Sequence, residues 1–507
     1  MSVRYIHRFY HRRSFSQAMM IRNTGPKAAY RLLEFVNASP TPFHAVEAAS
    51  KRLDSAGFKK ACPTKLEDWK PDLLNILADQ GSRLLGEHIG SRREILHYSS
   101  TAQHSNQSAL VAFTLPRGWK KSSGAGLSIV ATHIDSPNLR VRPVSKKSKA
   151  GYVQVGVELY GGGIWHSWLD RDLSLAGRVV ISNGNGFTAK LVNIKRPILR
   201  IPTLAIHLDR NVNAEFKFNQ ETEFVPIAGL VEAELNGKQT SEEESGATSV
   251  QANHHAAILS VVAEELSVAP TQIHDFELHL YDTQPSQLGG LNEEFVFSPR
   301  LDNQFSSFCA VDAIATADHS QGDKVNCIAL FNHEEVGSVS STGAESDLVP
   351  TLLRRLSPTP ELTAQSIARS FLLSCDMGHA IHPNYTSKHE DNHAPKINGG
   401  VVIKTNAKQR YASDAVGSFI VKKLIEKKNG RVQEYEVRND MACGSTVGPF
   451  LSKLGVRVVD IGLAMLSMHS IRETAGSHDA QHAVDLFTAF FEDFTSIDQQ
   501  EQNLLVD

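Results

Sequence analysis

The sequence has 507 residues, of which 41% are hydrophobic and 21% are charged, a composition typical of a soluble globular protein with two or more domains. Lysine and arginine number 52 against 55 acidic residues, and the net charge of −3 gives no electrostatic reason to expect nucleic acid. The sequence has no uninterrupted apolar run near the roughly 18 residues that cross a bilayer, so we expect no membrane role.

Two features of composition bear on the compartment of the protein. Residues 1–26 are basic and contain no acidic residue. This is typical of a mitochondrial transit peptide, but a disordered basic extension, with Met19 or Met20 as an alternative start, explains it as well. The five cysteines are odd in number and scattered, as in intracellular proteins with reduced thiols.

The periodicity of the chain predicts an α/β core that is interrupted once. Helical spacing at residues 27–38 and 43–56 is followed by predicted strands at 110–115 and 127–131. From residue 137 to about 287 short alternating segments and glycine-containing turns predict a β-rich insertion. We therefore expect a core of residues 27–136 and 288–507, a mixed sheet flanked by helices, split by an inserted domain at 137–287.

The first candidate site residues stand where a predicted strand stops. The apolar run that ends at Thr132 is followed by His133 and Asp135, and then by a Ser-Pro pair that ends the strand. The spacing of two residues places both side chains on one face of an extended chain. A carboxylate in that position can fix the tautomer of a metal-binding histidine.

A second strand ending carries two adjacent carboxylates. The apolar run at residues 325–331 is followed by Glu334, Glu335 and a glycine. In open α/β sheets the chemistry lies at the carboxyl ends of the strands. Such a pair can divide its work, one carboxylate binding a metal and the other handling protons. An exposed acidic turn is the ordinary alternative.

Three more candidates lie at or near the ends of predicted elements. They are Asp302 before a helical pattern, Asp376 after the run at 371–375, and His469 after the predicted strand at 456–461. Each has an ordinary interpretation as a cap or a satisfied polar group, and Asp302 could be a helix N-cap. Taken together, the candidates supply two histidines and three carboxylates for a two-metal hydrolytic site, with Glu334 left as a base.

Five ordered motifs closely resemble those of the aspartyl aminopeptidase family. They are His133-Ile134-Asp135-Ser136-Pro137, Arg300-Leu301-Asp302-Asn303, Asn332-His333-Glu334-Glu335-Val336-Gly337-Ser338, Cys375-Asp376-Met377-Gly378-His379-Ala380 and Ser467-Met468-His469-Ser470-Ile471-Arg472-Glu473. The resemblance extends from about residue 27 to the C-terminus.

The resemblance implies a co-catalytic zinc aminopeptidase that removes N-terminal aspartate or glutamate from peptides. The motifs then assign His133 and Asp376 to one zinc ion, Glu335 and His469 to the other, and Asp302 to both as a bridge.

By the same resemblance Glu334 is the general base, and Asp135 orients His133. All of these positions match the family. The donor set alone does not select zinc, because histidine and carboxylate ligands also accept manganese or cobalt.

The resemblance also gives the insertion a role. In the family the inserted domain is a dimerisation domain, and the dimers assemble into a dodecamer. A histidine that matches His207 reaches a neighbouring subunit's site, where it stabilises the tetrahedral intermediate. By itself His207 would be an ordinary polar residue.

Three further positions are candidates for substrate binding. An acidic side chain requires a buried cation, and Lys404, which follows an apolar run, matches the family's substrate-carboxylate lysine. His382 matches a histidine that lines the active site in the family, although it would also suit a polar loop. Tyr411 is a candidate for polarising the scissile carbonyl.

Two alternative functions stay open at this point. One is a two-metal deacylase or carboxypeptidase that acts on another amide, against which Lys404 and His207 argue. The other is a catalytically silent assembly or cargo protein of the same fold, which the loss of a ligand would have favoured. The family is usually cytosolic and in fungi also vacuolar, so we favour a basic extension over a mitochondrial transit peptide.

Overall fold

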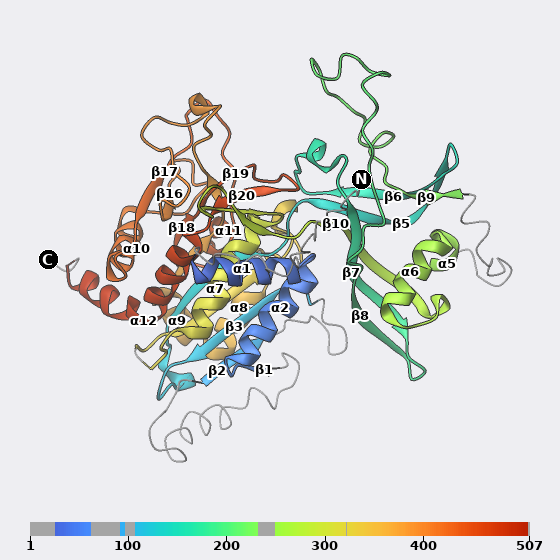
Figure 1. Ribbon diagram of the computed structural model, residues 1–507. Helices are drawn as coiled ribbons and strands as arrows, with labels where there is room; N and C mark the ends of the chain where they lie inside the picture. Colours follow the sequence, from blue (N-terminus) through green and yellow to red (C-terminus); the bar gives the residue numbers. More distant parts are fainter. Residues whose placement is uncertain (1–25, 62–91, 97–106, 232–248, 321, 505–507) are drawn as a thin grey trace, which may run out of the picture.

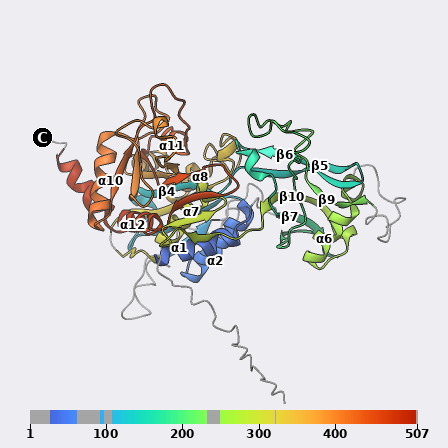
Figure 2. The same cartoon turned by 45° about the horizontal axis from the view of Figure 1, so that its top comes forward.

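Two bodies make up the chain in the computed structural model, which describes residues 26–61, 92–96, 107–231, 249–320 and 322–504 (Figure 1). The larger body is built on a nine-stranded sheet and the smaller one on a six-stranded sheet, and they lie side by side (Figure 2). Within the described residues, no helix combines the length and the apolar character needed to cross a membrane. The basic segment at residues 1–25 and the polar stretch at 232–248 lie outside the described residues.

The nine-stranded sheet forms the centre of the larger body. Its strands in spatial order are β1 (Lys59–Ala61), β2 (Arg92–Leu96), β3 (Leu110–Leu115), β13 (Val325–Phe331), β4 (Leu127–His133), β14 (Phe371–Cys375), β18 (Arg457–Gly462), β16 (Val401–Lys404) and β17 (Val432–Tyr435). The neighbouring strands β13, β4, β14 and β18 are parallel, so their carboxyl ends meet at one edge of the sheet.

Helices cover both faces of this sheet (Figure 1). One face is covered by α1 (Lys27–Ala38), α2 (Pro42–Ser55), α7 (Leu301–Thr316), α10 (Ala415–Lys427) and α12 (Asp479–Leu504). The other face is covered by α8 (Leu348–Leu356), α9 (Pro360–Ala368) and α11 (Gly448–Ser452). Successive strand residues point to opposite faces, so Ile129 lies in one core and Val130 in the other. This two-sided burial explains why the central strands are almost continuously apolar.

A small five-stranded sheet adjoins the larger body. Its strands in spatial order are β11 (Gln287–Gly289), β12 (Phe295–Ser298), β20 (Glu473–Gly476), β19 (Ala464–Leu466) and β15 (Gly378–His379). Strands β19 and β20 pair antiparallel and hold the loop at residues 467–472 between them. Strand β12 pairs with β20, with Ser298 opposite Glu473, so the chain that leads into α7 starts beside that loop.

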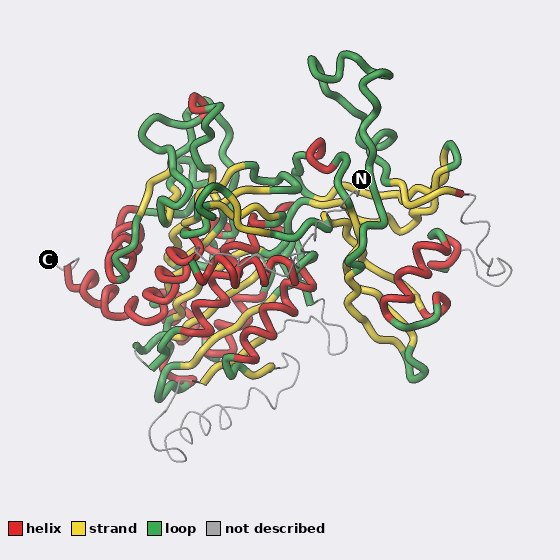
Figure 3. The backbone as a smooth tube through the Cα atoms, in the orientation of Figure 1, coloured by secondary structure: helices red, strands yellow, loops and turns green. Residues whose placement is uncertain are grey.

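The smaller body is an antiparallel sheet with helices on it. Its strands in spatial order are β8 (Phe187–Asn193), β7 (Leu173–Ser182), β10 (Ile273–Asp282), β5 (Asn138–Lys149), β6 (Tyr152–Tyr160) and β9 (Ile227–Leu230). Two helices, α5 (Val250–Asn253) and α6 (Ala256–Leu266), lie between β9 and β10 in the sequence. Helix α6 packs against the sheet and shares an apolar core with it. A long loop near residues 202–226 carries no strand or helix and projects from this body (Figure 3).

The observed elements agree with the sequence-based prediction, with two informative differences. Strand β4 extends two residues beyond the predicted end, so His133 is its last residue. Asp302 is not a helix N-cap: Arg300 holds that position, and Asp302 lies inside α7 with non-helical backbone angles. Its side chain is therefore not occupied with capping the helix.

Candidate active site

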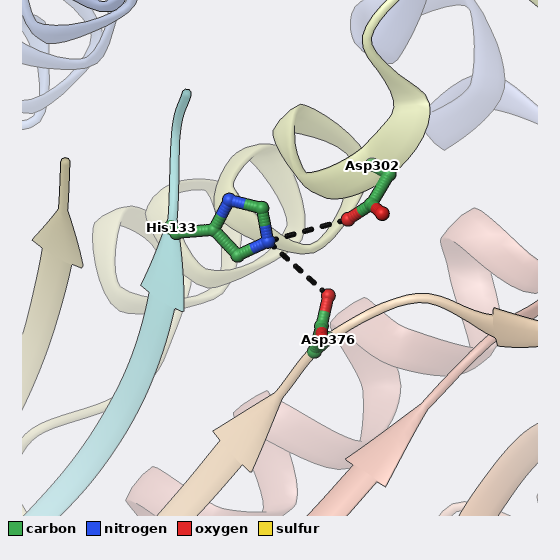
Figure 4. A group of neighbouring side chains, drawn as sticks. All are labelled: His133, Asp302 and Asp376. Atoms are coloured by element: carbon green, nitrogen blue, oxygen red, sulfur yellow. Dashed lines mark hydrogen bonds and ion pairs between the residues drawn. The ribbon is translucent and has the colours of Figure 1, made fainter. Parts of the chain in front are cut away.

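The metal-ligand candidates gather at the carboxyl edge of the nine-stranded sheet. His133 ends β4, Glu334 and Glu335 lie in the turn after β13, Asp376 follows β14, His469 lies in the loop between β19 and β20, and Asp302 lies at the start of α7. Figure 4 shows three of them, with His133 and Asp376 on neighbouring strand ends and Asp302 facing them from the helix. The structure therefore brings together all six residues that the strand ends and motifs suggested.

Two histidine–carboxylate groups share Asp302. The Nε2 atom of His133 lies 3.2 Å from Asp302 Oδ1 and 3.3 Å from Asp376 Oδ1 (Figure 4). The Nε2 atom of His469 lies 3.2 Å from Asp302 Oδ2 and 3.4 Å from Glu335 Oε2. Each oxygen of the Asp302 carboxylate thus faces one histidine, which is the arrangement that a carboxylate bridging two cations requires.

The site suits cations because its carboxylates outnumber its histidines. Asp302 Oδ1 and Glu335 Oε1 are buried without a hydrogen-bond donor among the described residues. Although burial opposes it, the nearby carboxylates of Glu334 and others raise the pKa of His133 well above its usual value. Four carboxylates face one another here, so two divalent cations would neutralise them. Histidine nitrogens and carboxylate oxygens are among the ligands that zinc binds.

Glu334 stands beside this ligand set. Its Oε2 lies 3.9 Å from His133 Nε2, and its side chain keeps 16% of its surface exposed. Burial raises the pKa of Glu334 to about 8, and the negative charge of Asp376 adds to the effect. A carboxylate with a raised pKa accepts a proton readily near neutral pH, which is the property of a general base.

Asp135 fixes the position of several of these groups. Its carboxylate accepts hydrogen bonds from the backbone N–H groups of Glu334 at 3.2 Å and Glu335 at 3.1 Å, and from the Tyr160 hydroxyl at 2.6 Å. The Nδ1 atom of His133 lies 3.5 Å from Asp135 Oδ1 and 3.1 Å from the Asp135 carbonyl oxygen. A carbonyl oxygen can only accept, so Nδ1 carries the proton and Nε2 is left to face the carboxylates.

The smaller body contributes to the site through its glycine-rich turn. The carbonyl oxygen of Gly162 accepts a hydrogen bond from His469 Nδ1 at 2.9 Å, so Nδ1 carries a proton and Nε2 faces the carboxylates. Gly161 has a positive φ of 76°, and a Cβ there would lie 3.1 Å from Glu335 Cβ. Glycine therefore permits the close approach of this turn to the site.

Lys404 and Tyr411 lie next to Asp376. Lys404 is 2% exposed, donates a hydrogen bond from Nζ to the Met377 carbonyl oxygen at 2.7 Å, and lies 3.9 Å from Asp376 Oδ2. The Tyr411 ring is buried, and its centroid lies 5.4 Å from Lys404 Nζ. Half-buried His382 lines a cavity of about 280 Å³.

This cavity brings the His382 loop toward the loop that carries His469. Ser467 and Met468, the two residues before His469, also line it. His382 itself accepts a hydrogen bond at Nδ1 from the backbone N–H of Asn384 at 3.2 Å. The structure thus places His382 beside the ligand loop rather than within the ligand set.

His207 does not join the candidates of its own chain. It is exposed in the loop that projects from the smaller body (Figures 1 and 3). Exposed apolar residues accompany it on the same loop, with Leu204 at 59% and Leu208 at 75% exposure.

Two residues of the site received no role from the sequence. Tyr160 hydrogen-bonds Asp135 from the end of β6, far from every motif. Glu473 accepts hydrogen bonds from the backbone N–H groups of Asp302 and His469. Glu473 ends the fifth motif, but its position four residues after His469 does not by itself indicate a partner.

Comparisons with known proteins agree with this geometry. Residues 93–491 match the family model described as aminopeptidase I zinc metalloprotease (M18). The chain is 45% identical to an aspartyl aminopeptidase of Aspergillus oryzae, over 92% of this chain and 96% of the relative. It is 44% identical to aspartyl aminopeptidase 1 of Schizosaccharomyces pombe, over 96% of this chain and 98% of the relative.

Solved structures show the same similarity. A chain from the cryo-EM structure of the Ape4 and Nbr1 complex has a TM-score of 0.83 and 43% identity, covering 95% of this chain and 87% of that one. The mApe1 dodecamer of Saccharomyces cerevisiae has a TM-score of 0.75 and 26% identity, covering 94% of this chain and 98% of that one.

Proposed function

Because the chain belongs to the aminopeptidase I zinc metalloprotease (M18) family, it is a metal-dependent aminopeptidase, and we propose that it removes aspartate or glutamate from the N-terminus of peptides. The observation that carries the proposal is the pair of histidine–carboxylate groups that share Asp302. A buried lysine beside one of these groups supports the acidic preference.

The ligand set fits two zinc ions. His133 and Asp376 would hold one ion, Glu335 and His469 the other, and Asp302 both. When bound, such ions polarise a carbonyl and lower the pKa of a water from about 15.7 toward about 7. The hydrogen bonds that His133 Nδ1 and His469 Nδ1 donate to backbone carbonyl oxygens leave both Nε2 atoms available as ligands.

Glu334 moves the proton of the reaction. Its Oε2 takes a proton from the water that attacks the scissile carbonyl and gives it to the nitrogen of the leaving amine. The Asp135 carboxylate holds the turn that carries Glu334 by accepting hydrogen bonds from two backbone N–H groups of that turn. Because the N–H groups of Glu334 and Glu335 are both held, the backbone that carries the Glu334 side chain stays in place while the carboxylate gains and loses a proton.

Lys404 selects the acidic side chain of the substrate. It is a buried cation, and the carbonyl oxygen of Met377 accepts only one of its three possible hydrogen bonds. A substrate carboxylate would accept another, which is worth roughly 1.5–3 kcal/mol for a charged pair. The Tyr411 ring lies beside the lysine, and His382 lines a cavity that Ser467 and Met468 of the ligand loop also line.

His207 acts in a neighbouring subunit. Its loop is exposed and carries apolar side chains, which is unfavourable for a lone subunit and suits contact with a second copy. One similar structure is a dodecamer, and this chain would assemble into dimers and then into an oligomer of that kind. An imidazole donor aimed at a developing oxyanion contributes about 2.7–4 kcal/mol.

Metal analysis and a substrate panel test the proposed function. The purified protein should contain two zinc ions per subunit and should cleave aspartyl and glutamyl substrates in preference to leucyl ones. An N-acetylated aspartyl substrate should not be cleaved, because an aminopeptidase requires a free amine. Faster cleavage of the leucyl substrate would refute the acidic preference, and cleavage of the N-acetylated substrate would favour a deacylase.

A further inference from the structure

Glu473 connects two metal-ligand loops through their backbones. Its Oε1 accepts a hydrogen bond from the N–H of His469 at 2.7 Å, and its Oε2 accepts one from the N–H of Asp302 at 3.1 Å. The side chain is buried, with 2% exposure. One carboxylate therefore fixes the spacing between the bridging ligand and one of the histidines.

The His469 backbone requires such support. His469 has a φ of 66° and Ser467 a φ of 58°, a left-handed conformation that is unfavourable for residues other than glycine. The Glu473 carboxylate holds the N–H of His469 in that conformation. Without this acceptor the loop would relax toward ordinary backbone angles, and the imidazole would move away from Asp302.

Glu473 is itself held rigidly. It begins β20, where it pairs with Ser298 of β12. The preceding residue, Arg472, donates hydrogen bonds to the carbonyl oxygens of Gln284 at 2.8 Å, Pro285 at 3.2 Å and Phe297 at 3.1 Å. Because its backbone is held in this way, the Glu473 carboxylate can fix the positions of the two loops.

A structural role alone would leave a different signature. A cavity of about 30 Å³ adjoins Glu473, His469 and Arg300, and a water needs roughly 10–15 Å³. After loss of the carboxylate, a water could accept the hydrogen bonds of the N–H groups left without a partner, so the protein would lose little stability. A water cannot hold two loops at a fixed spacing, so the geometry of the ligands would be lost.

We propose that Glu473 is a positioning residue that sets the metal affinity of the group formed by Asp302, Glu335 and His469. The inference rests on the metal site proposed above and adds to it a residue that touches neither substrate nor metal. Loss of an outer partner of metal ligands typically weakens metal binding by 10- to 100-fold. We expect that loss for one of the two ions in Glu473→Gln, whose amide offers one acceptor in place of two.

Asp479 provides a matched control. It is also a buried carboxylate of the larger body, and it accepts backbone hydrogen bonds from Asn398 at 2.7 Å and Gly400 at 3.0 Å. Neither of these residues is a metal-ligand candidate. Asp479→Asn therefore removes one of two acceptor oxygens, as Glu473→Gln does, without touching the ligand loops.

The experiment measures zinc dissociation constants by competition with a chelator, and the visible spectra of the cobalt-substituted proteins. Glu473→Gln should release one ion 10- to 100-fold more readily and change the cobalt spectrum, whereas Asp479→Asn should match the wild type in both. Equal zinc affinities for both variants and the wild type would overturn the inference. A wild type that binds fewer than two ions would instead overturn the metal site itself.

A second variant covers a failure of Glu473→Gln to fold. Glu473→Asp keeps both acceptor oxygens but withdraws them by one methylene group. Its zinc affinity should lie between that of the wild type and that of His469→Ala, which lacks a ligand of the same ion. Wild-type zinc affinity in Glu473→Asp, together with an unchanged cobalt spectrum, would refute the positioning role.

Discussion

Replacement of Lys404 by methionine isolates the charge that we assign to substrate selection. Methionine fills similar volume, so the buried position keeps its packing while the Nζ donor is lost. Lys404 is 2% exposed and makes one hydrogen bond of 2.7 Å, to the Met377 carbonyl. The removed interaction with a substrate carboxylate is worth about 1.5–3 kcal/mol, and each 1.36 kcal/mol is tenfold in rate. The expected loss in kcat/KM for an aspartyl substrate is therefore about 10- to 150-fold.

The metal site should tolerate this change. Lys404 Nζ lies 3.9 Å from Asp376 Oδ2, so the lysine attracts that ligand but also repels any cation the ligand holds. The two effects have opposite signs, and we expect Lys404→Met to keep both zinc ions. The kcat/KM for a leucyl substrate should not fall, because that side chain makes no hydrogen bond to the lysine.

The assay is kcat/KM for aspartyl, glutamyl and leucyl substrates, with zinc content measured on the same samples. Lys423→Met is the control, since Lys423 is exposed and pairs with Glu426 at 2.8 Å on the outer face of α10. An equal loss for acidic and leucyl substrates in Lys404→Met would refute the reasoning. It would mean that Lys404 acts on Asp376 and not on the substrate.

Three other changes test separate parts of the structure. Glu334→Gln should lower kcat by about 10²- to 10⁴-fold with zinc content unchanged, measured by kinetics and metal analysis, because it removes the proton carrier alone. His207→Ala should be nearly as inactive, but mixing it with Glu334→Gln subunits should restore activity if the histidine acts between subunits; absence of recovery would contradict that role. Burial lowers the pKa of His44 from 6.5 to about 4. As the pH falls, His44 is therefore protonated in the unfolded chain before it is protonated in the folded protein, and the free energy of unfolding should fall by about 3 kcal/mol between pH 6.5 and 4. Urea unfolding at several pH values should show a smaller fall for His44→Gln.

The strand endings were predictable because they depend on local chemistry. The runs before His133, Glu334 and Asp376 are buried on both faces and mostly apolar, so ionisable side chains are expected only where the strand ends. Parallel pairing of β4, β13 and β14 then brings these endings to one edge. The sequence predicts that edge without knowledge of the strand order.

The remaining contacts were not predictable because they depend on pairings between distant segments. Glu473 faces Asp302 only because β20 pairs with β12, and no periodicity in either segment indicates that register. Tyr160 reaches Asp135 from the end of a strand in the other body. His207 could be assigned only by resemblance, since its loop has neither strand nor helix and lies away from the site.

The smaller body contacts residues of the candidate active site directly. Gly162 accepts a hydrogen bond from Nδ1 of His469 and so helps to orient that ring, and Tyr160 donates to the carboxylate that holds the Glu334 turn. A segment that served assembly alone would have no need of a glycine whose Cβ would lie 3.1 Å from Glu335. The chain leaves the sheet after His133 and returns to it before Asp302, and between them its glycine-rich turn contacts two other metal-ligand candidates, His469 and Glu335.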